Sequence, residues 1–180
     1  MLRLLFLNIS MLMALSGISY ASSFNLLRKN RIIVDKSEDL VVLTAIDIFK
    51  SDLHKVSGGN MQSDNSELWV GTIGNNSELE KFMKKYRISI KDIKGKWEAF
   101  KIICVDENKL LVVGSDPRGT AYGVLELSRM MGVSPWEWWA DVHPDKKDFL
   151  YIDKGVVTVQ SPSVQYRGIF LNDEDWALLP

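Results

Sequence analysis

The stretch "SDPRGTAYGVLELSRMMGV", Ser115 to Val133, gives the strongest fold signal in the sequence. Asp116 suits the cap of a helix, Pro117 the first helical position, and Gly132 the position after the last turn. Between them, apolar residues recur at helical spacing: Tyr122, Val124, Leu125, Leu127 and Met130. The stretch therefore predicts an amphipathic helix, and the apolar run before it predicts a strand that leads into it.

Other apolar runs predict a sheet around this helix. They lie at residues 31–35, 67–74, 97–105, 109–115, 149–153 and 156–160. The runs 97–105 and 109–115 flank a short polar stretch and predict a hairpin or a pair of neighbouring strands. Strands that alternate with helices, followed by such a pair, predict an α/β fold, an α+β sandwich whose mixed sheet is covered by helices.

Two further helices are predicted upstream. Ser37 suits the cap of the first, whose apolar positions recur from Val42 to Val56 before Gly58 and Gly59 end it. Ser77, with a glutamate three residues later, forms a capping-box pattern that opens the second.

The two ends of the chain differ from its middle. Residues 1–21 contain one arginine, a short apolar core and small residues up to Ala21, which predicts a signal peptide cleaved near Ala21 and a secreted or periplasmic bacterial protein. The alternative is an uncleaved anchor, but the apolar run is shorter than the ~20 residues that a membrane span needs, so stable membrane insertion is not expected. Residues 25–160 are predicted to form an N-terminal α/β domain, and 161–180 a linker and an opening strand.

Composition narrows the function classes. The 22 basic and 23 acidic residues nearly cancel, so nucleic-acid binding has little support. Cys104 is the single cysteine, which excludes an intramolecular disulfide, and its apolar surroundings predict a small buried hydrophobe. His54 and His143 have no partners at ligand spacing, so no metal site is predicted.

Two motifs in the middle of the chain invite a functional interpretation. "GSDPRGT" (114–120) has the glycine spacing of a phosphate loop, but Thr120 stands where that motif has lysine, which favours plain architecture. Arg118 could present its guanidinium from the helix start, although a solvated arginine is the simpler interpretation.

Three tryptophans, Trp136, Trp138 and Trp139, follow the main helix. Flat aromatic faces suit sugar stacking, and their large area equally suits a core or an interface. In a β-like stretch, Trp136 and Trp138 would share one face, so at least one tryptophan is expected to be buried and one to lie near a ligand.

The chain ends on "YRGIFLNDEDWALLP", Tyr166 to Pro180. Tyr166 to Leu171 is predicted to be a strand, and Asn172, Asp173, Glu174 and Asp175 follow at its tip. Such a density of carboxylates suits a solvated turn, a cation site or a sugar site.

At this point two motifs, "GSDPRGTAYGVLELSRMMGVSPWEWWADV" (114–142) and "PSVQYRGIFLNDEDW" (162–176), resemble glycoside hydrolase family 115, the xylan α-glucuronidases. The resemblance implies a small α/β domain like the amino-terminal domain of hexosaminidases, followed by the first strand of a (β/α)₈ barrel whose remainder is missing. It also implies removal of 4-O-methylglucuronic acid from glucuronoxylan with inversion, without a cofactor.

The resemblance also assigns site residues. It places Asn172, Asp173, Glu174 and Asp175 at the rim of the uronic-acid pocket and Trp176 in its wall, with Arg118, Trp136, Trp138 and Trp139 as possible secondary contacts. An inverting enzyme needs two carboxyl groups roughly 6.5–9.5 Å apart, which neighbours in sequence seldom provide. No complete catalytic pair is therefore expected in this chain, and the fragment alone is expected to be inactive.

The expected partners are glucuronoxylan, or an oligosaccharide that bears glucuronic acid, and the missing remainder of the barrel. Two alternatives stay open: a non-catalytic carbohydrate-binding module that uses the tryptophan stretch, and a structural accessory domain. The exposure of the three tryptophans is expected to help separate them.

Overall fold

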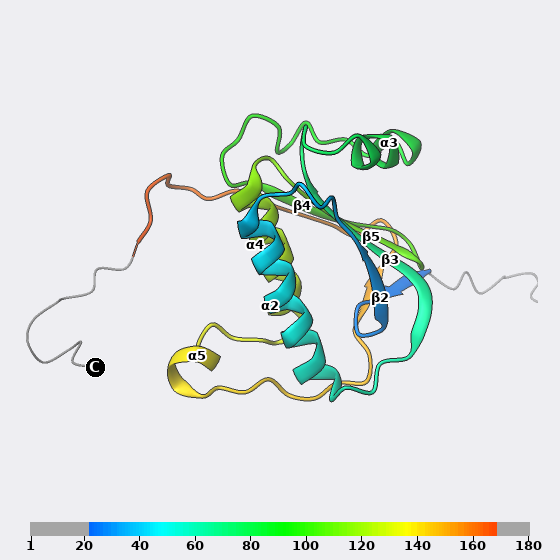
Figure 1. Cartoon of the computed structure of the whole chain (residues 1–180), viewed down its shortest axis with the longest axis vertical. Helices are drawn as coiled ribbons and strands as arrows, with labels where there is room; N and C mark the ends of the chain where they lie inside the picture. The colour runs from blue at the N-terminus through cyan, green and yellow to red at the C-terminus, as the bar shows by residue number, and fades with distance from the viewer. Residues whose placement is uncertain (1–21, 169–180) are drawn as a thin grey trace, which may run out of the picture.

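The structure, a computed structural model, describes residues 22–168 (Figure 1). The predicted signal peptide and the predicted site residues Asn172, Asp173, Glu174, Asp175 and Trp176 lie outside this range. The described helices include none that is long and apolar enough to cross a membrane.

A five-stranded mixed sheet forms the centre of the fold, in agreement with the predicted α/β class. Its strands lie side by side in the order β2 (Lys29–Ile33), β3 (Ser63–Thr72), β5 (Lys109–Gly114), β4 (Phe100–Asp106) and β7 (Val157–Gln160). β2, β3 and β5 run parallel, whereas β4 is antiparallel to both β5 and β7. The predicted hairpin is thus confirmed as β4–β5. A second, two-stranded sheet pairs β1 (Ser23–Asn25) with β6 (Tyr151–Asp153).

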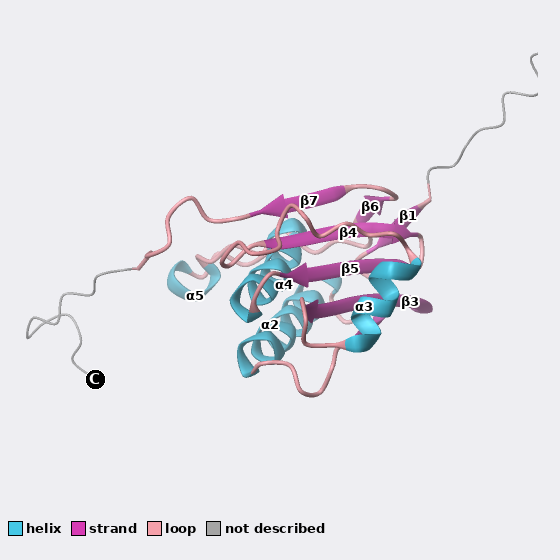
Figure 2. Cartoon of the chain, turned by 90° about the horizontal axis from the view of Figure 1, so that it is seen from above, coloured by secondary structure: helices cyan, strands magenta, loops and turns pink. Residues whose placement is uncertain are grey.

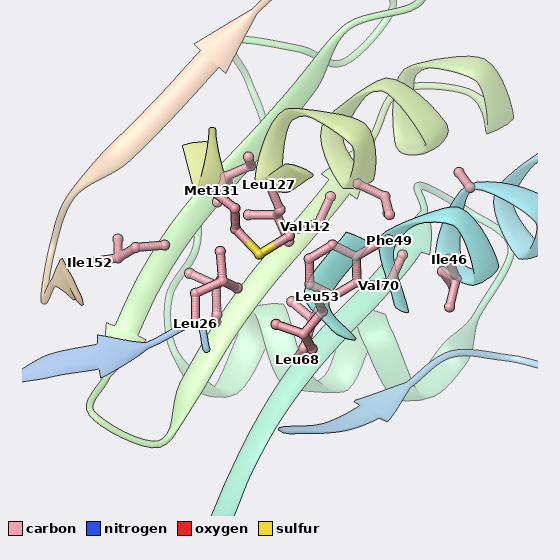
Figure 3. Packing of buried hydrophobic residues seen from close by; sticks show 14 of the residues in the cluster. Leu26, Ile46, Phe49, Leu53, Leu68, Val70, Val112, Leu127, Met131 and Ile152 are labelled. Atoms are coloured by element: carbon pink, nitrogen blue, oxygen red, sulfur yellow. The ribbon is translucent and has the colours of Figure 1, made fainter. Parts of the chain in front are cut away.

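Helices cover both faces of the five-stranded sheet. Figure 2 shows α2 (Leu40–Ser57) and α4 (Pro117–Met131) on one face and α3 (Ser77–Lys85) on the other. Side chains alternate along β5 accordingly: Leu110 and Val112 belong to the core under α2 and α4, while Leu111 and Val113 belong to the core under α3. In Figure 3, α2 and α4 meet above the sheet through Phe49, Leu53, Leu127 and Met131.

The ends of α4 confirm the prediction made from its sequence. The Asp116 carboxylate accepts a hydrogen bond from the Gly119 backbone N–H at 2.7 Å, and Pro117 occupies the first turn. Gly132 ends the helix with φ 96°, in the left-handed region where glycine carries no Cβ penalty.

The predicted caps of the other two helices are wrong by one or two residues. Asp39, not Ser37, caps α2 by accepting from Val41 N, while Ser37 donates to the Asp35 carboxylate. Asn76, not Ser77, caps α3 by accepting from Glu78 N at 2.8 Å. Asp, Asn and Ser are all good caps, so the residue type alone does not choose among neighbours.

The strand predicted from Tyr166 is absent over the residues that the structure describes. β7 ends at Gln160, and the chain from Ser161 to Gly168 is irregular. Tyr166 is highly exposed and belongs to no strand. The predicted continuation through Leu171 lies outside the described range.

Candidate functional site

A cavity of about 750 Å³ opens on the outer side of α4. Five parts of the chain form it: α2, the start of β4 with the loop before it, α4, the tryptophan stretch, and the end of β7 with the segment that follows. Its lining includes Tyr122, Leu125, Glu126, Trp138, Trp139 and Arg167. Aromatic, apolar and charged groups therefore face one hollow, which is the usual composition of a binding or docking site.

The tryptophan stretch forms one wall of the cavity as a helical turn, α5 (Glu137–Ala140), so the predicted β-like alternation is wrong. Trp136, Trp138 and Trp139 are 62%, 75% and 76% exposed, so the expectation that at least one is buried is also wrong. The turn is held by a polar contact instead: Lys55 Nζ, in the last turn of α2, lies 2.9 Å from the Glu137 carboxylate. Figure 1 shows α5 beside that end of α2.

Glu126 is the carboxylate that α4 turns toward the cavity. It accepts hydrogen bonds from Arg129 Nε at 2.7 Å and Arg129 Nη2 at 2.6 Å, and from Gln160 Nε2 at 3.2 Å. Both carboxylate oxygens are therefore engaged in hydrogen bonds within the domain. Its geometry favours a structural role that ties α4 to the end of β7.

Asp52 of α2 lies deeper in the same cavity. Burial raises the pKa of this carboxyl, and Lys55 Nζ, 3.7 Å away, opposes that shift. Lys55 thus lies between the carboxylates of Asp52 and Glu137. The positive charge of Lys55 partly neutralises these two carboxylates on the wall that carries the tryptophans.

Arg118, predicted as a possible secondary contact, is exposed but already engaged. Its Nε lies 3.0 Å from Glu98 Oε1, and its Nη2 donates to the Tyr122 hydroxyl at 3.1 Å. The hydrogen bond to Tyr122, with the charge of Glu98, raises the pKa of Arg118 further. The guanidinium therefore serves contacts within the domain.

The glycines of "GSDPRGT" serve close packing, as the plain-architecture interpretation expected. A Cβ on Gly114 would lie 2.1 Å from the Thr120 backbone N, and one on Gly119 would lie 2.4 Å from the Ala99 carbonyl. Thr120 is buried, and its hydroxyl lies 2.8 Å from that of Thr72 on β3. These contacts seat the start of α4 against the sheet.

Sequence reasoning missed most of the residues that build the cavity. Glu98, Glu126 and Arg167 come from three separate stretches, and no local spacing connects them. Within residues 22–168, no three side chains of the metal-binding types gather as a site. Cys104 is buried, as predicted, and burial raises the pKa of its thiol.

Comparisons with known proteins place this geometry in context. A scan against models of protein families and a search of curated proteins found no match. Among solved structures, the chain is similar to BtGH115A, a family GH115 4-O-methyl-α-glucuronidase with specificity for decorated arabinogalactans. The identity is 44%, the alignment covers 85% of this chain and 20% of that chain, and the TM-score is 0.71. A second structure, CpGH84B, matches at 19% identity over 77% of this chain and 20% of that one, with a TM-score of 0.47.

The mixed-sheet domain and its high identity to part of a glucuronidase define the chain as a domain of the glycoside hydrolase class. More particularly, the chain belongs to glycoside hydrolase family 115, which confirms the resemblance found in its sequence motifs. It spans 20% of the length of each of the two solved chains described above.

Proposed function

We propose that this chain is the amino-terminal α/β domain of a secreted α-glucuronidase. The substrate class is a polysaccharide that bears glucuronic acid or its 4-O-methyl ether, with glucuronoxylan first and decorated arabinogalactan second. The observation that carries the proposal is the 44% identity to a 4-O-methyl-α-glucuronidase over 85% of this chain. The reaction is inverting hydrolysis, and Asn172, Asp173, Glu174, Asp175 and Trp176 contribute to the uronic-acid site.

The described domain is proposed to support catalysis without performing it. Three carboxylates line the cavity, and each has a cation beside it: Glu126 pairs with Arg129, Glu98 with two arginines, and Asp52 with a lysine. Inverting hydrolysis needs one carboxyl that holds a proton and one that activates water. All three carboxylates are engaged in contacts within the domain, which supports a catalytic pair made elsewhere in the enzyme.

The tryptophan-lined cavity is proposed to receive the part of the enzyme that follows. After β7 the chain passes along this cavity, because Gln160, Ser161, Pro162 and Arg167 all contribute to its lining. The segment after β7 therefore runs along a cavity that two exposed tryptophans, Trp138 and Trp139, also line. Large exposed aromatic surface next to such a connection is typical of a docking face.

A second candidate is carbohydrate binding by the same cavity, favoured by the exposed faces of Trp138 and Trp139. One experiment separates the two functions. The 180-residue chain, and the polypeptide obtained when translation continues past Pro180, are each incubated with glucuronoxylan and with glucuronic-acid-decorated arabinogalactan. Released uronic acid and tryptophan fluorescence are both followed.

The proposal expects uronic acid from the longer polypeptide alone and no saturable fluorescence change with the 180-residue chain. Saturable binding by the short chain, abolished in a Trp138→Ala/Trp139→Ala variant and retained in Tyr151→Ala, would establish the carbohydrate-binding function instead. Tyr151 is a suitable control because it is exposed on the separate β1–β6 sheet. If the longer polypeptide releases no uronic acid from either substrate, the glucuronidase assignment is wrong.

A further inference from the structure

Glu98 lies between two arginines at the edge of the cavity. Arg118 Nε is 3.0 Å from Glu98 Oε1, and the Arg167 guanidinium pairs with Glu98 Oε2. The guanidinium carbon of Arg167 also lies 5.8 Å from the ring centroid of Trp97 and 5.9 Å from that of Tyr122. Both distances fall within the ~6 Å range of cation–π attraction. These five residues, the Glu98 cluster, join the loop before β4, the first turns of α4 and the segment after β7.

The backbone of Glu98 is fixed independently of its side chain. Its φ is 51°, in the left-handed region that residues with a Cβ seldom adopt. Its N–H donates to Asp116 Oδ2 at 2.6 Å, and the other oxygen of that carboxylate caps α4 through Gly119 N. Such a conformation persists only where the surroundings hold it. The Glu98 carboxylate is therefore presented from a rigid position at the start of α4.

Arg167 belongs to a segment that is otherwise loosely attached. Residues 161–168 form neither helix nor strand, and Tyr166, the neighbour of Arg167, is 90% exposed. Arg167 donates to the Val164 carbonyl at 2.6 Å as well as to Glu98, so its side chain both folds this segment and ties it to the domain. Among the described residues, Arg167 supplies the side-chain hydrogen bond from this segment to the rest of the domain.

We propose that the Glu98 cluster is a positioning site: it fixes where the chain leaves the α/β domain and so sets the starting point of the motif that begins at Asn172. This inference rests on the proposed function, because that function gives the motif its role in the uronic-acid site. Glu98 and Arg167 act as positioning residues through the ion pair between them. Arg118 pairs with the other oxygen of this carboxylate, Glu98 Oε1.

Hydrogen exchange of the 180-residue chain, followed by mass spectrometry on peptides covering residues 161–168, tests the proposal. The variants are Glu98→Gln, Arg167→Gln and their combination, with Arg118→Gln as the matched control. Arg118 makes an ion pair with the same carboxylate, but it does not belong to the segment after β7. The unfolding temperature of each variant is measured alongside, so that a global loss of stability is recognised.

Arg167→Gln is expected to speed exchange in this segment about three- to fivefold, the size that a partly exposed charged pair supports. Glu98→Gln should also speed exchange, and the double variant should add little to the effect of Arg167→Gln, because all three variants lose the ion pair between Glu98 and Arg167. Arg118→Gln should leave the rate within about twofold. Unchanged exchange in Arg167→Gln, or an equal effect of Arg118→Gln, would overturn the proposal. Hydrogen exchange is measured without enzyme activity. A wrong glucuronidase assignment would therefore be detected separately, by the uronic-acid assay.

Discussion

At the scale of single residues, the buried carboxyl of Asp52 lowers the stability of the folded state at neutral pH. Its carboxyl is buried, and burial raises its pKa above the ordinary value of 3.8. A raised pKa means that the folded state binds this proton more tightly than the unfolded state. The stabilising contribution is therefore fully present below about pH 3.8, the unfolded value, and is lost as the pH rises through the folded-state pKa. At neutral pH the charged side chain opposes folding.

Asp52→Asn should consequently stabilise the protein at pH 7 and have little effect at pH 3. We expect the unfolding temperature at pH 7 to rise by about 2–4 °C, the shift that ~1 kcal/mol causes in a domain of this size. Thermal unfolding at both pH values measures it, with Asp47→Asn as control, since Asp47 lies on the same helix and is exposed. A lower unfolding temperature for Asp52→Asn at pH 7 would show that its attraction to Lys55 outweighs its burial.

At the scale of helices and strands, the sequence prediction that several local signals support together was correct. α4 was predicted at both ends because its cap, its first proline and its terminal glycine are all local signals. The tryptophan turn was predicted wrongly because its anchor, the contact between Lys55 and Glu137, joins residues far apart in the sequence. The caps of α2 and α3 were misplaced because adjacent residues are equally good cap formers.

The same anchor yields a prediction for α5. Lys55→Gln leaves the carboxylates of Asp52 and Glu137, both largely buried, without their shared cation. We expect the free energy of unfolding to fall by about 1–3 kcal/mol at pH 7, the usual cost of removing a partner from a buried polar group. Chemical denaturation measures this. Lys50→Gln is the matched control, because Lys50 forms an exposed pair with Asp47 on the same helix, and we expect it to change stability by less than about 0.5 kcal/mol. Equal effects of the two variants would contradict the anchoring role.

At the scale of the whole molecule, the sequence predicted the layers but not the cavity. The order of strands and helices follows from periodicity within each stretch, and the mixed sheet follows from the β4–β5 pair. The cavity, by contrast, is assembled from segments as distant as Asp52 and Arg167. Its polar pairs depend on how α2, α4 and the segment after β7 pack together. No local sequence pattern predicts that packing.

The tryptophan-lined cavity is proposed to face the rest of a larger glycoside hydrolase. Hydroxyl-radical footprinting of the 180-residue chain and of the longer polypeptide read past Pro180 tests it most directly. If the cavity is covered in this way, Trp138 and Trp139, which are 75% and 76% exposed here, should be oxidised at least several-fold more slowly in the longer polypeptide. Tyr151, exposed on the separate β1–β6 sheet, should be oxidised equally in both. Equal oxidation of the two tryptophans in both polypeptides would contradict the account.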